Sequence, residues 1–268
     1  MAEQVLAELV EIVPGGVEED RGAGYVEYAI YGPPGELPAL PDLQAAAGDG
    51  LVEIETTEIP DDWADRWRDF HDPVVVGGGR IVVRPSWEAE APDVTAAEID
   101  IVVDPGQAFG TGAHATTKSC LEILLDLADR GEASGPLVDW GTGSAVLAIA
   151  AAKLGWDPVT GVDHEIPAVE AARENAEAND VVGTFERVNL REEAPPVAPT
   201  IVANITAPLL LELAARIGSG EIECPETMVL SGILRTELDR VHDAYRDAGL
   251  TARNVVESGE WAALLLRG

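Results

Sequence analysis

The sequence predicts an α/β protein in which a small α+β domain precedes a doubly wound sheet of seven strands. Three observations support this fold class. Between residues 137 and 247, short apolar runs alternate with helical patterns, as in a parallel sheet covered by helices. A glycine-rich turn separates the first of these strands from an alanine-rich helix. Two apolar runs around Gly259 predict a terminal hairpin, which places one antiparallel strand in an otherwise parallel sheet.

The first 60 residues predict the small α+β domain. Apolar positions at helical spacing between residues 2 and 12 predict a short helix that Pro14 ends. Alternating residues predict two strands joined by a turn at residues 21–24. A second short helix near residues 40–47 and a strand over residues 51–59 complete this domain.

Residues 61–98 predict a linker between the two domains. A helix is expected over residues 61–73, because three aromatic residues recur there at intervals of four and three and share one face. These residues are Trp63, Trp67 and Phe70. Two short strands are predicted around the glycines at 77–79, and an acidic stretch then leads into the domain that spans residues 99–268.

The glycine-rich turn is built to let a ligand approach the backbone. It reads Asp139-Trp140-Gly141-Thr142-Gly143-Ser144-Ala145. Gly141 permits a sharp bend, Gly143 removes a side chain that would strike the ligand, and a small residue at 145 lets helix pack on strand. Asp163 ends the next strand, where a carboxylate can accept hydrogen bonds from both hydroxyls of a ribose. The alternative is an ordinary strand-to-helix turn followed by a surface Asp.

Polar side chains mark the carboxyl ends of three predicted strands. They are Asp139, Asp163 and Asn204. Because ligands of doubly wound sheets bind beyond these ends, we expect the three residues in one site. The remaining elements are predicted as helices over 165–179, 208–217 and 234–247 and strands over 99–103, 184–190, 200–203 and 227–231.

Composition narrows the classes of partner. The net charge is −32, from 49 acidic and 17 basic residues, so direct binding to nucleic acid is not expected. Adaptation to a salty solvent and attraction of a basic partner both remain open as causes of this charge. No apolar run is long enough to span a membrane, the N-terminus carries no basic export signal, and the two cysteines form no metal pattern. We therefore expect a cytoplasmic protein without a metal site, in which Cys120 is a small buried residue.

Several motifs together are similar to one known family. DPGQAFGTGAHATT precedes the glycine turn, Asn204 lies in VANIT, and DWADRWRDFHDPVVVG forms the linker. LSGIL at 230–234 and the pair Glu260-Trp261 complete the set. Over roughly residues 61–268 these motifs resemble the ribosomal protein L11 methyltransferase family, PrmA. The turn D-x-G-x-G-x-A itself resembles the first motif of class I S-adenosylmethionine-dependent methyltransferases.

The resemblance implies a Rossmann-like methyltransferase fold with a ferredoxin-like N-terminal domain that recognises the protein substrate. It implies S-adenosylmethionine as the cofactor and the basic ribosomal protein L11 as the partner, methylated on lysine side chains or on its N-terminal amine. It implies that Asp139 and Gly143, both in the glycine-rich turn, are among the residues of the cofactor site. The other implied cofactor contacts are Thr117, Gly141, Asp163 and Asn204, with Phe109 and Thr116 in a covering loop.

Each of these residues also has a simpler interpretation. Thr116 or Thr117 could cap the helix that follows, and Phe109 could be a core residue. Asn204 could be a loop residue before the next helix. His114 is interpreted as a polar loop residue rather than a catalytic base.

The sequence departs from the family pattern in four places. Thr142 and Ala145 stand where the family usually has Cys and Gly, and Ala115 stands where it has Pro. We expect Ala145 to narrow the space beside the cofactor. We expect the N-terminal domain to lack an opening strand, which leaves the identity of the substrate open. A methyltransferase acting on another protein or a small amine is therefore the second hypothesis, and a non-catalytic binding module is the third. The glycine spacing disfavours a nicotinamide-dependent oxidoreductase, whose turn has the pattern G-x-G-x-x-G.

The expected chemistry is an in-line displacement in which a neutral amine attacks the methyl carbon of a sulfonium. Positioning supplies most of the acceleration in such a reaction. A lysine amine has a pKa of about 10.4 and is mostly protonated at neutral pH. The site must therefore remove a proton from the ammonium group or bind the neutral amine selectively, and desolvation favours the neutral amine. No residue is a clear general base. The hypothesis is that Asn204 orients the amine and that water accepts its proton.

Overall fold

The computed structural model describes residues 18–22, 25–29, 73–88, 97–104 and 114–268. The chain divides into two compact units, Met1–Asp62 and Trp63–Gly268. In the first unit, β1 (Glu18–Gly22) and β2 (Tyr25–Ala29) form the antiparallel hairpin that the alternating pattern predicts. The other elements predicted for the N-terminal domain and the linker helix lie outside the described residues.

The second unit is built on the predicted seven-stranded sheet. Its strands are β6 (Leu137–Trp140), β7 (Val159–Asp163), β8 (Gly183–Arg187), β9 (Thr200–Asn204), β10 (Thr227–Leu234), β11 (Thr251–Ser258) and β12 (Trp261–Arg267). They lie in the order β11-β12-β10-β9-β6-β7-β8. β12 runs antiparallel to both of its neighbours, whereas the pairs from β10 to β8 are parallel. The prediction of one antiparallel strand from a terminal hairpin is therefore confirmed.

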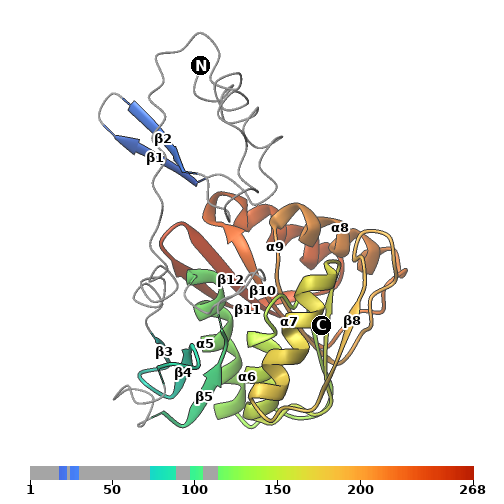
Figure 1. The fold of residues 1–268 in the computed structure, drawn as a ribbon. Coiled ribbons are helices and arrows are strands. Elements are labelled where there is room, and N and C mark those ends of the chain that lie inside the picture. The colour runs from blue at the N-terminus through green and yellow to red at the C-terminus, as the bar shows by residue number, and fades with distance from the viewer. Residues whose placement is uncertain (1–17, 23–24, 30–72, 89–96, 105–113) are drawn as a thin grey trace. The chain divides into compact units, whose positions relative to one another are not determined.

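Helices cover both faces of this sheet, and Figure 1 shows them in chain order. They are α5 (Ala115–Asp129), α6 (Val146–Leu154), α7 (Ile166–Ala178), α8 (Ala207–Gly218) and α9 (Leu238–Asp247). A short 3₁₀ turn, η2 (Arg235–Glu237), precedes α9. Successive residues of a strand point to opposite faces. Leu137 accordingly joins the core cluster of α5, α6 and α7, whereas Val138 joins the cluster of α8 and α9.

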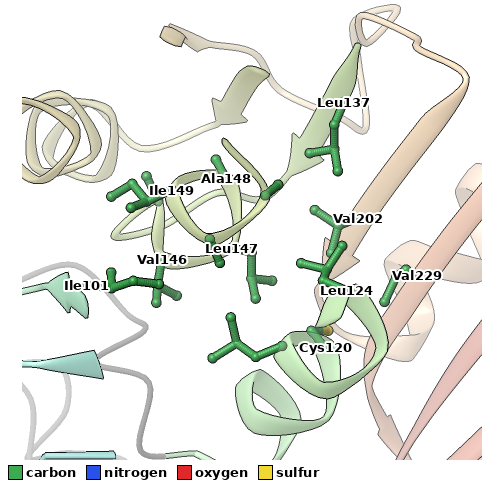
Figure 2. Packing of buried hydrophobic residues seen from close by; sticks show 14 of the residues in the cluster. Ile101, Cys120, Leu124, Leu137, Val146, Leu147, Ala148, Ile149, Val202 and Val229 are labelled. Atoms are coloured by element: carbon green, nitrogen blue, oxygen red, sulfur yellow. The ribbon is translucent and has the colours of Figure 1, made fainter. Parts of the chain in front are cut away.

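A separate sheet of three strands packs against the first of these clusters. It consists of β3 (Val74–Val76), β4 (Ile81–Arg84) and β5 (Ile99–Val102), with β4 and β5 parallel. Figure 2 shows Ile101 of β5 beside Val146 and Ile149 of α6, with Cys120 and Leu124 of α5 nearby. Cys120 is completely buried, as predicted. The boundary expected between residues 98 and 99 runs through this sheet, because β5 pairs with β4.

The boundaries of other elements differ slightly from their predictions. β8 ends at Arg187 instead of residue 190, and β10 continues to Leu234 because its last residues pair with the start of β12. Within the ranges that the structure describes, no helix has the length and apolar character that crossing a membrane requires.

Candidate active site

A cavity of about 490 Å³ lies beyond the carboxyl ends of β6, β7, β8 and β9. Its volume suits a ligand of cofactor size. The polar residues that line it come from α5, the glycine turn and the segments that follow the strands. They are Thr117, Thr142, Asp163, His164, Glu165, Asn189, Arg191, Asn204 and Thr206. Gly141 and Gly143 also line the cavity, so the structure brings five of the eight predicted site residues together: Thr117, Gly141, Gly143, Asp163 and Asn204.

The glycine turn places bare backbone against the cavity. Gly141 has φ +75°, a conformation that residues with a side chain rarely adopt. A Cβ atom at this position would lie 2.4 Å from Cγ2 of Ile205, another residue that lines the cavity. The backbone N–H of Gly141 donates to the carbonyl oxygen of Val162, which ties the turn to β7. Glycine is therefore required here both for backbone conformation and for space.

Asp163 is held in one orientation at the end of β7. Its Oδ2 accepts a hydrogen bond from the backbone N–H of Gly143 over 3.0 Å, and its Oδ1 accepts one from that of Glu165 over 3.1 Å. The ring atom Nδ1 of His164 lies 3.2 Å from Oδ1. Each carboxylate oxygen has two lone pairs, so both can still accept from a ligand. The carboxylate is thus fixed beside the glycine turn with acceptor capacity to spare.

Asp139 lies beneath the turn and does not line the cavity. Its side chain is buried, and its Oδ2 accepts a hydrogen bond from the hydroxyl of Thr142 over 2.8 Å. Burial raises the pKa of Asp139 to about 7, against the hydrogen bond from Thr142, which lowers it. The prediction that Asp139 touches a ligand does not fit this position. Its carboxylate instead stabilises the turn through the hydroxyl of Thr142.

Asn204 and Thr117 meet inside the cavity, although they come from β9 and α5. The Nδ2 of Asn204 donates a hydrogen bond to Oγ1 of Thr117 over 3.2 Å. This contact leaves Oδ1 of Asn204, a strong acceptor, for a ligand. Thr117 is 1% exposed and does not cap the helix, so its hydroxyl serves the cavity. The side-chain oxygen of Asn204 is therefore oriented as an acceptor at the end of β9.

The residue that caps α5 is His114. Its Nδ1 accepts a hydrogen bond from the backbone N–H of Thr116 at 3.4 Å and lies 2.7 Å from the hydroxyl of Thr116. Its ring meets that of Trp261 edge-on, with 5.0 Å between the centroids. Thr116 was expected in a covering loop, but it is buried in the first turn of α5 and does not line the cavity. Phe109 lies outside the described residues.

Ala145 does not narrow the cavity as expected. It is completely buried within the core cluster of α5 and α6, and it is absent from the cavity lining. Its φ of 64° and ψ of 15° place it in the left-handed region at the start of α6. This conformation favours glycine over residues that carry a side chain.

Sequence reasoning missed the wall that follows β8. Asn189, Leu190 and Arg191 line the cavity, and so does His164 directly after Asp163. The signal was present, because β8 is parallel to β7 and its carboxyl end must meet the same edge of the sheet. Because the strand was predicted to end at residue 190 instead of 187, Asn189 and Leu190 were placed inside it, and the wall was not recognised.

This arrangement can bind a ligand that carries hydroxyl groups and positive charge. Asp163 and Glu165 bring carboxylates to the lining, whereas Arg191 is paired with Glu212. The glycine turn offers backbone without side chains, and Asn204 offers a neutral acceptor. A carboxamide oxygen can accept a hydrogen bond from an amine without drawing a proton onto itself.

Comparison with known proteins identifies a similar family. Residues 41–268 match the family model described as ribosomal protein L11 methyltransferase (PrmA). A protein of Heliobacterium modesticaldum called ribosomal protein L11 methyltransferase is 40% identical over 210 residues, which is 77% of this chain and 64% of that protein. The protein of the same name from Shewanella frigidimarina is 43% identical over 213 residues, which is 78% of this chain and 68% of that protein. The chain thus spans about two thirds of the length of the curated relatives that it matches.

A solved structure shares the fold. The crystal structure of ribosomal protein L11 methylase from Lactobacillus delbrueckii subsp. bulgaricus matches with a TM-score of 0.59 at 30% identity. The match covers 70% of this chain and 94% of that one. The seven-stranded sheet of the second unit is therefore an architecture that a methylase also has.

Proposed function

Because this chain belongs to the ribosomal protein L11 methyltransferase (PrmA) family, we propose that it transfers methyl groups from S-adenosylmethionine to amino groups of the large-subunit ribosomal protein L11. The observation that carries the proposal is the position of Asn204. Its free carboxamide oxygen shares one cavity with the glycine turn and the fixed carboxylate of Asp163. The cavity thus combines groups suited to a nucleoside with an acceptor suited to an amine.

The described residues fit the cofactor. Asp163 would accept hydrogen bonds from the two ribose hydroxyls, because both of its oxygens are oriented by backbone N–H groups and have free lone pairs. The bare backbone of Gly141 and Gly143 would allow the cofactor to approach the turn closely. Bound S-adenosylmethionine would supply a methyl group on a positively charged sulfur.

Asn204 would bind the amine that accepts the methyl group. Its Oδ1 accepts a hydrogen bond from the amine, which orients the nitrogen lone pair, while Thr117 fixes the carboxamide from the other side. Orientation of this kind contributes strongly to the rate, because the amine loses its translational and rotational freedom when it binds and not during the reaction itself. Partial burial of the site favours the neutral amine over its ammonium form. The proton that the amine releases passes to water.

The first 60 residues would recognise the protein substrate. They hold 13 acidic residues and a single basic residue, Arg21. A surface of this sign attracts a basic protein and raises its association rate at low salt. If the negative charge serves to attract the basic substrate, the rate at which protein and substrate associate falls as the salt concentration rises. If the charge is an adaptation to a salty solvent, the stability of the folded chain rises with the salt concentration instead.

The test is an intact-mass measurement. Unmethylated ribosomal protein L11 is incubated with the protein and S-adenosylmethionine, and Asp163→Ala serves as the control. We expect mass gains in methyl steps that the control loses. No gain, together with measurable binding of S-adenosylmethionine, would exclude ribosomal protein L11 and favour another protein or a small amine. Absence of cofactor binding would reject the proposal as a whole.

A further inference from the structure

The cavity wall after β8 is held from behind by one arginine. Asn189, Leu190 and Arg191 form this wall. Arg216, near the end of α8, donates from Nη1 to the carbonyl oxygen of Leu190 over 2.6 Å. It also donates from Nη2 to the carbonyl oxygen of Glu193 over 2.9 Å. One guanidinium therefore joins two points of the wall segment to α8.

The guanidinium of Arg216 is itself fixed. Its side chain is 15% exposed, and its Nε donates to Oε1 of Glu221 over 2.8 Å. The backbone N–H of Glu221 donates to the carbonyl oxygen of Arg216 over 3.0 Å, which closes a small ring of contacts. Because the guanidinium is planar and its donors are rigidly spaced, these contacts determine where its remaining N–H groups point. Charge-assisted hydrogen bonds to the two carbonyls are stronger than neutral ones.

A second contact from α8 reaches the same wall. Arg191 forms an ion pair with Glu212, which precedes Arg216 by one helical turn. Leu209 lines the cavity directly. Because residues three and four apart share a helix face, these residues of α8 face the wall together. Hydrogen bonds within the segment also fix its shape, since the N–H of Asn189 donates to Oε1 of Glu193 over 2.9 Å.

The strand order indicates which end of the cofactor meets this wall. Along the sheet, β9 carries Asn204, β6 carries the glycine turn, β7 carries Asp163, and β8 leads to the wall. This step rests on the proposed function, which puts the methyl group near Asn204 and the ribose at Asp163. The remaining end of the cofactor, its base, then extends toward β8. The wall is therefore the surface for the base.

We propose that Arg216 is a positioning residue for the base end of the cofactor. It acts through the backbone carbonyls of Leu190 and Glu193 and does not reach the reacting atoms. Loss of the Arg216 side chain leaves Asp163 and Asn204 in place but removes the hydrogen bonds that hold the wall against α8. Arg216 therefore determines how tightly the cofactor binds and not how fast the bound methyl group is transferred.

The test compares Arg216→Met with Arg267→Met as a matched control. Arg267 also bridges two segments, through Glu132 and Thr227, and its side chain is 28% exposed. Arg267 is the last residue of β12 and pairs with Thr227 at the start of β10, so it lies at the opposite end of the strands from the cavity. Affinity for S-adenosylmethionine, S-adenosylhomocysteine and adenosine is measured by titration calorimetry. Circular dichroism and thermal denaturation show whether each variant is folded.

We expect Arg216→Met to weaken binding of all three ligands at least tenfold, whereas Arg267→Met changes it less than twofold. The transfer rate at saturating S-adenosylmethionine should stay within twofold of wild type in both. Should Arg216→Met fail to fold, Arg216→Lys takes its place; its single ammonium cannot make all three contacts, so a smaller loss of the same kind is expected.

Two results would overturn this assignment while leaving the proposed function intact. One is wild-type affinity for all three ligands in the folded Arg216 variant. The other is a fall in transfer rate at saturation with unchanged affinity. Wild-type protein that binds none of the three ligands would overturn the proposed function and this assignment together.

Discussion

Asn204 donates a hydrogen bond from its Nδ2 to Oγ1 of Thr117 over 3.2 Å, across 87 positions of the sequence. One partner ends a central strand and the other lies in the first turn of α5. The contact determines which end of the carboxamide faces the cavity. The transfer reaction proposed for this site therefore depends on a residue that never needs to touch the amine.

The first prediction concerns this contact. Thr117→Val keeps the shape of the side chain but removes the acceptor, so the carboxamide of Asn204 can rotate. We expect the transfer rate at saturating cofactor to fall about tenfold, which corresponds to about 1.4 kcal/mol. Thr117→Ser retains the hydroxyl and should stay near wild type. Single-turnover methylation of ribosomal protein L11 measures both rates, and equal rates in Thr117→Val and Thr117→Ser would contradict the prediction.

The second prediction compares two glycines, to separate the cost of backbone strain from the cost of a steric clash with a neighbouring side chain. Gly141 and Gly131 have nearly the same φ, +75° and +72°, but a Cβ would meet Ile205 only at Gly141. Gly131→Ala should cost about 1 kcal/mol of unfolding free energy through backbone strain alone, without affecting cofactor affinity. Gly141→Ala should cost more and also weaken binding, because Ile205 lines the cavity. Denaturant unfolding and cofactor titration test this difference. Similar values for the two variants would show that the collision is relieved elsewhere.

The third prediction concerns pH. Burial raises the pKa of Asp139 to about 7, whereas an unfolded Asp has a pKa of about 3.9. The folded state therefore favours the protonated form. The stability that Asp139 contributes is fully present below about pH 4 and is lost as pH rises through about 7, on the order of 4 kcal/mol in all.

Asp139→Asn removes this titration and keeps an oxygen that can accept from Thr142. The unfolding free energy of the variant, minus that of wild type, should therefore rise between pH 4 and pH 8. Urea unfolding of both proteins at several pH values gives this difference, in which the remaining acidic groups cancel to first order. A difference that stays constant with pH would show that Asp139 titrates alike in the folded and unfolded chain.

The fourth prediction concerns Asn179, which joins α7 to β5. Its Oδ1 accepts from the N–H of Val102 over 2.8 Å, and its Nδ2 donates to the carbonyl oxygen of Val102 over 2.6 Å. Nδ2 also donates to the carbonyl oxygen of Asn175 over 2.8 Å. The side chain thus replaces a neighbouring strand at this point of β5.

Asn179→Ala should destabilise the protein by about 2–3 kcal/mol, because it removes these contacts from a buried position. Asn179→Asp should destabilise it at least as much at neutral pH, since a carboxylate oxygen would face two carbonyl oxygens. Hydrogen exchange at the N–H of Val102 should quicken in both variants. Wild-type exchange at Val102 in Asn179→Ala would mean that β4 alone holds this strand.

Much of the fold could be predicted from the sequence because its signals are local. The terminal hairpin, the alternation of strands and helices, and the left-handed backbone at Gly141 each follow from neighbouring residues. The boundary between the linker and the larger domain could not be predicted in this way. β5 pairs with β4, and Asn179 supplies part of its hydrogen bonding from a helix far along the chain. Contacts between segments so far apart in the sequence produce no hydrophobic periodicity that would reveal them in either segment.

The sequence by itself determined which positions carry polar groups at the ends of strands and where the turn needs glycine. Only the tertiary structure decided which of these groups reach the cavity. Thr116 and Thr117 are adjacent, but successive helical residues point about 100° apart, and the packing of α5 turns only Thr117 toward Asn204. Asp139 and Asp163 both lie near the ends of apolar strands, but the side chain of Asp139 lies beneath the turn, where burial raises its pKa. Arg216 had no recognisable pattern, because its role depends on the carbonyl oxygens of a segment that folding brings to it.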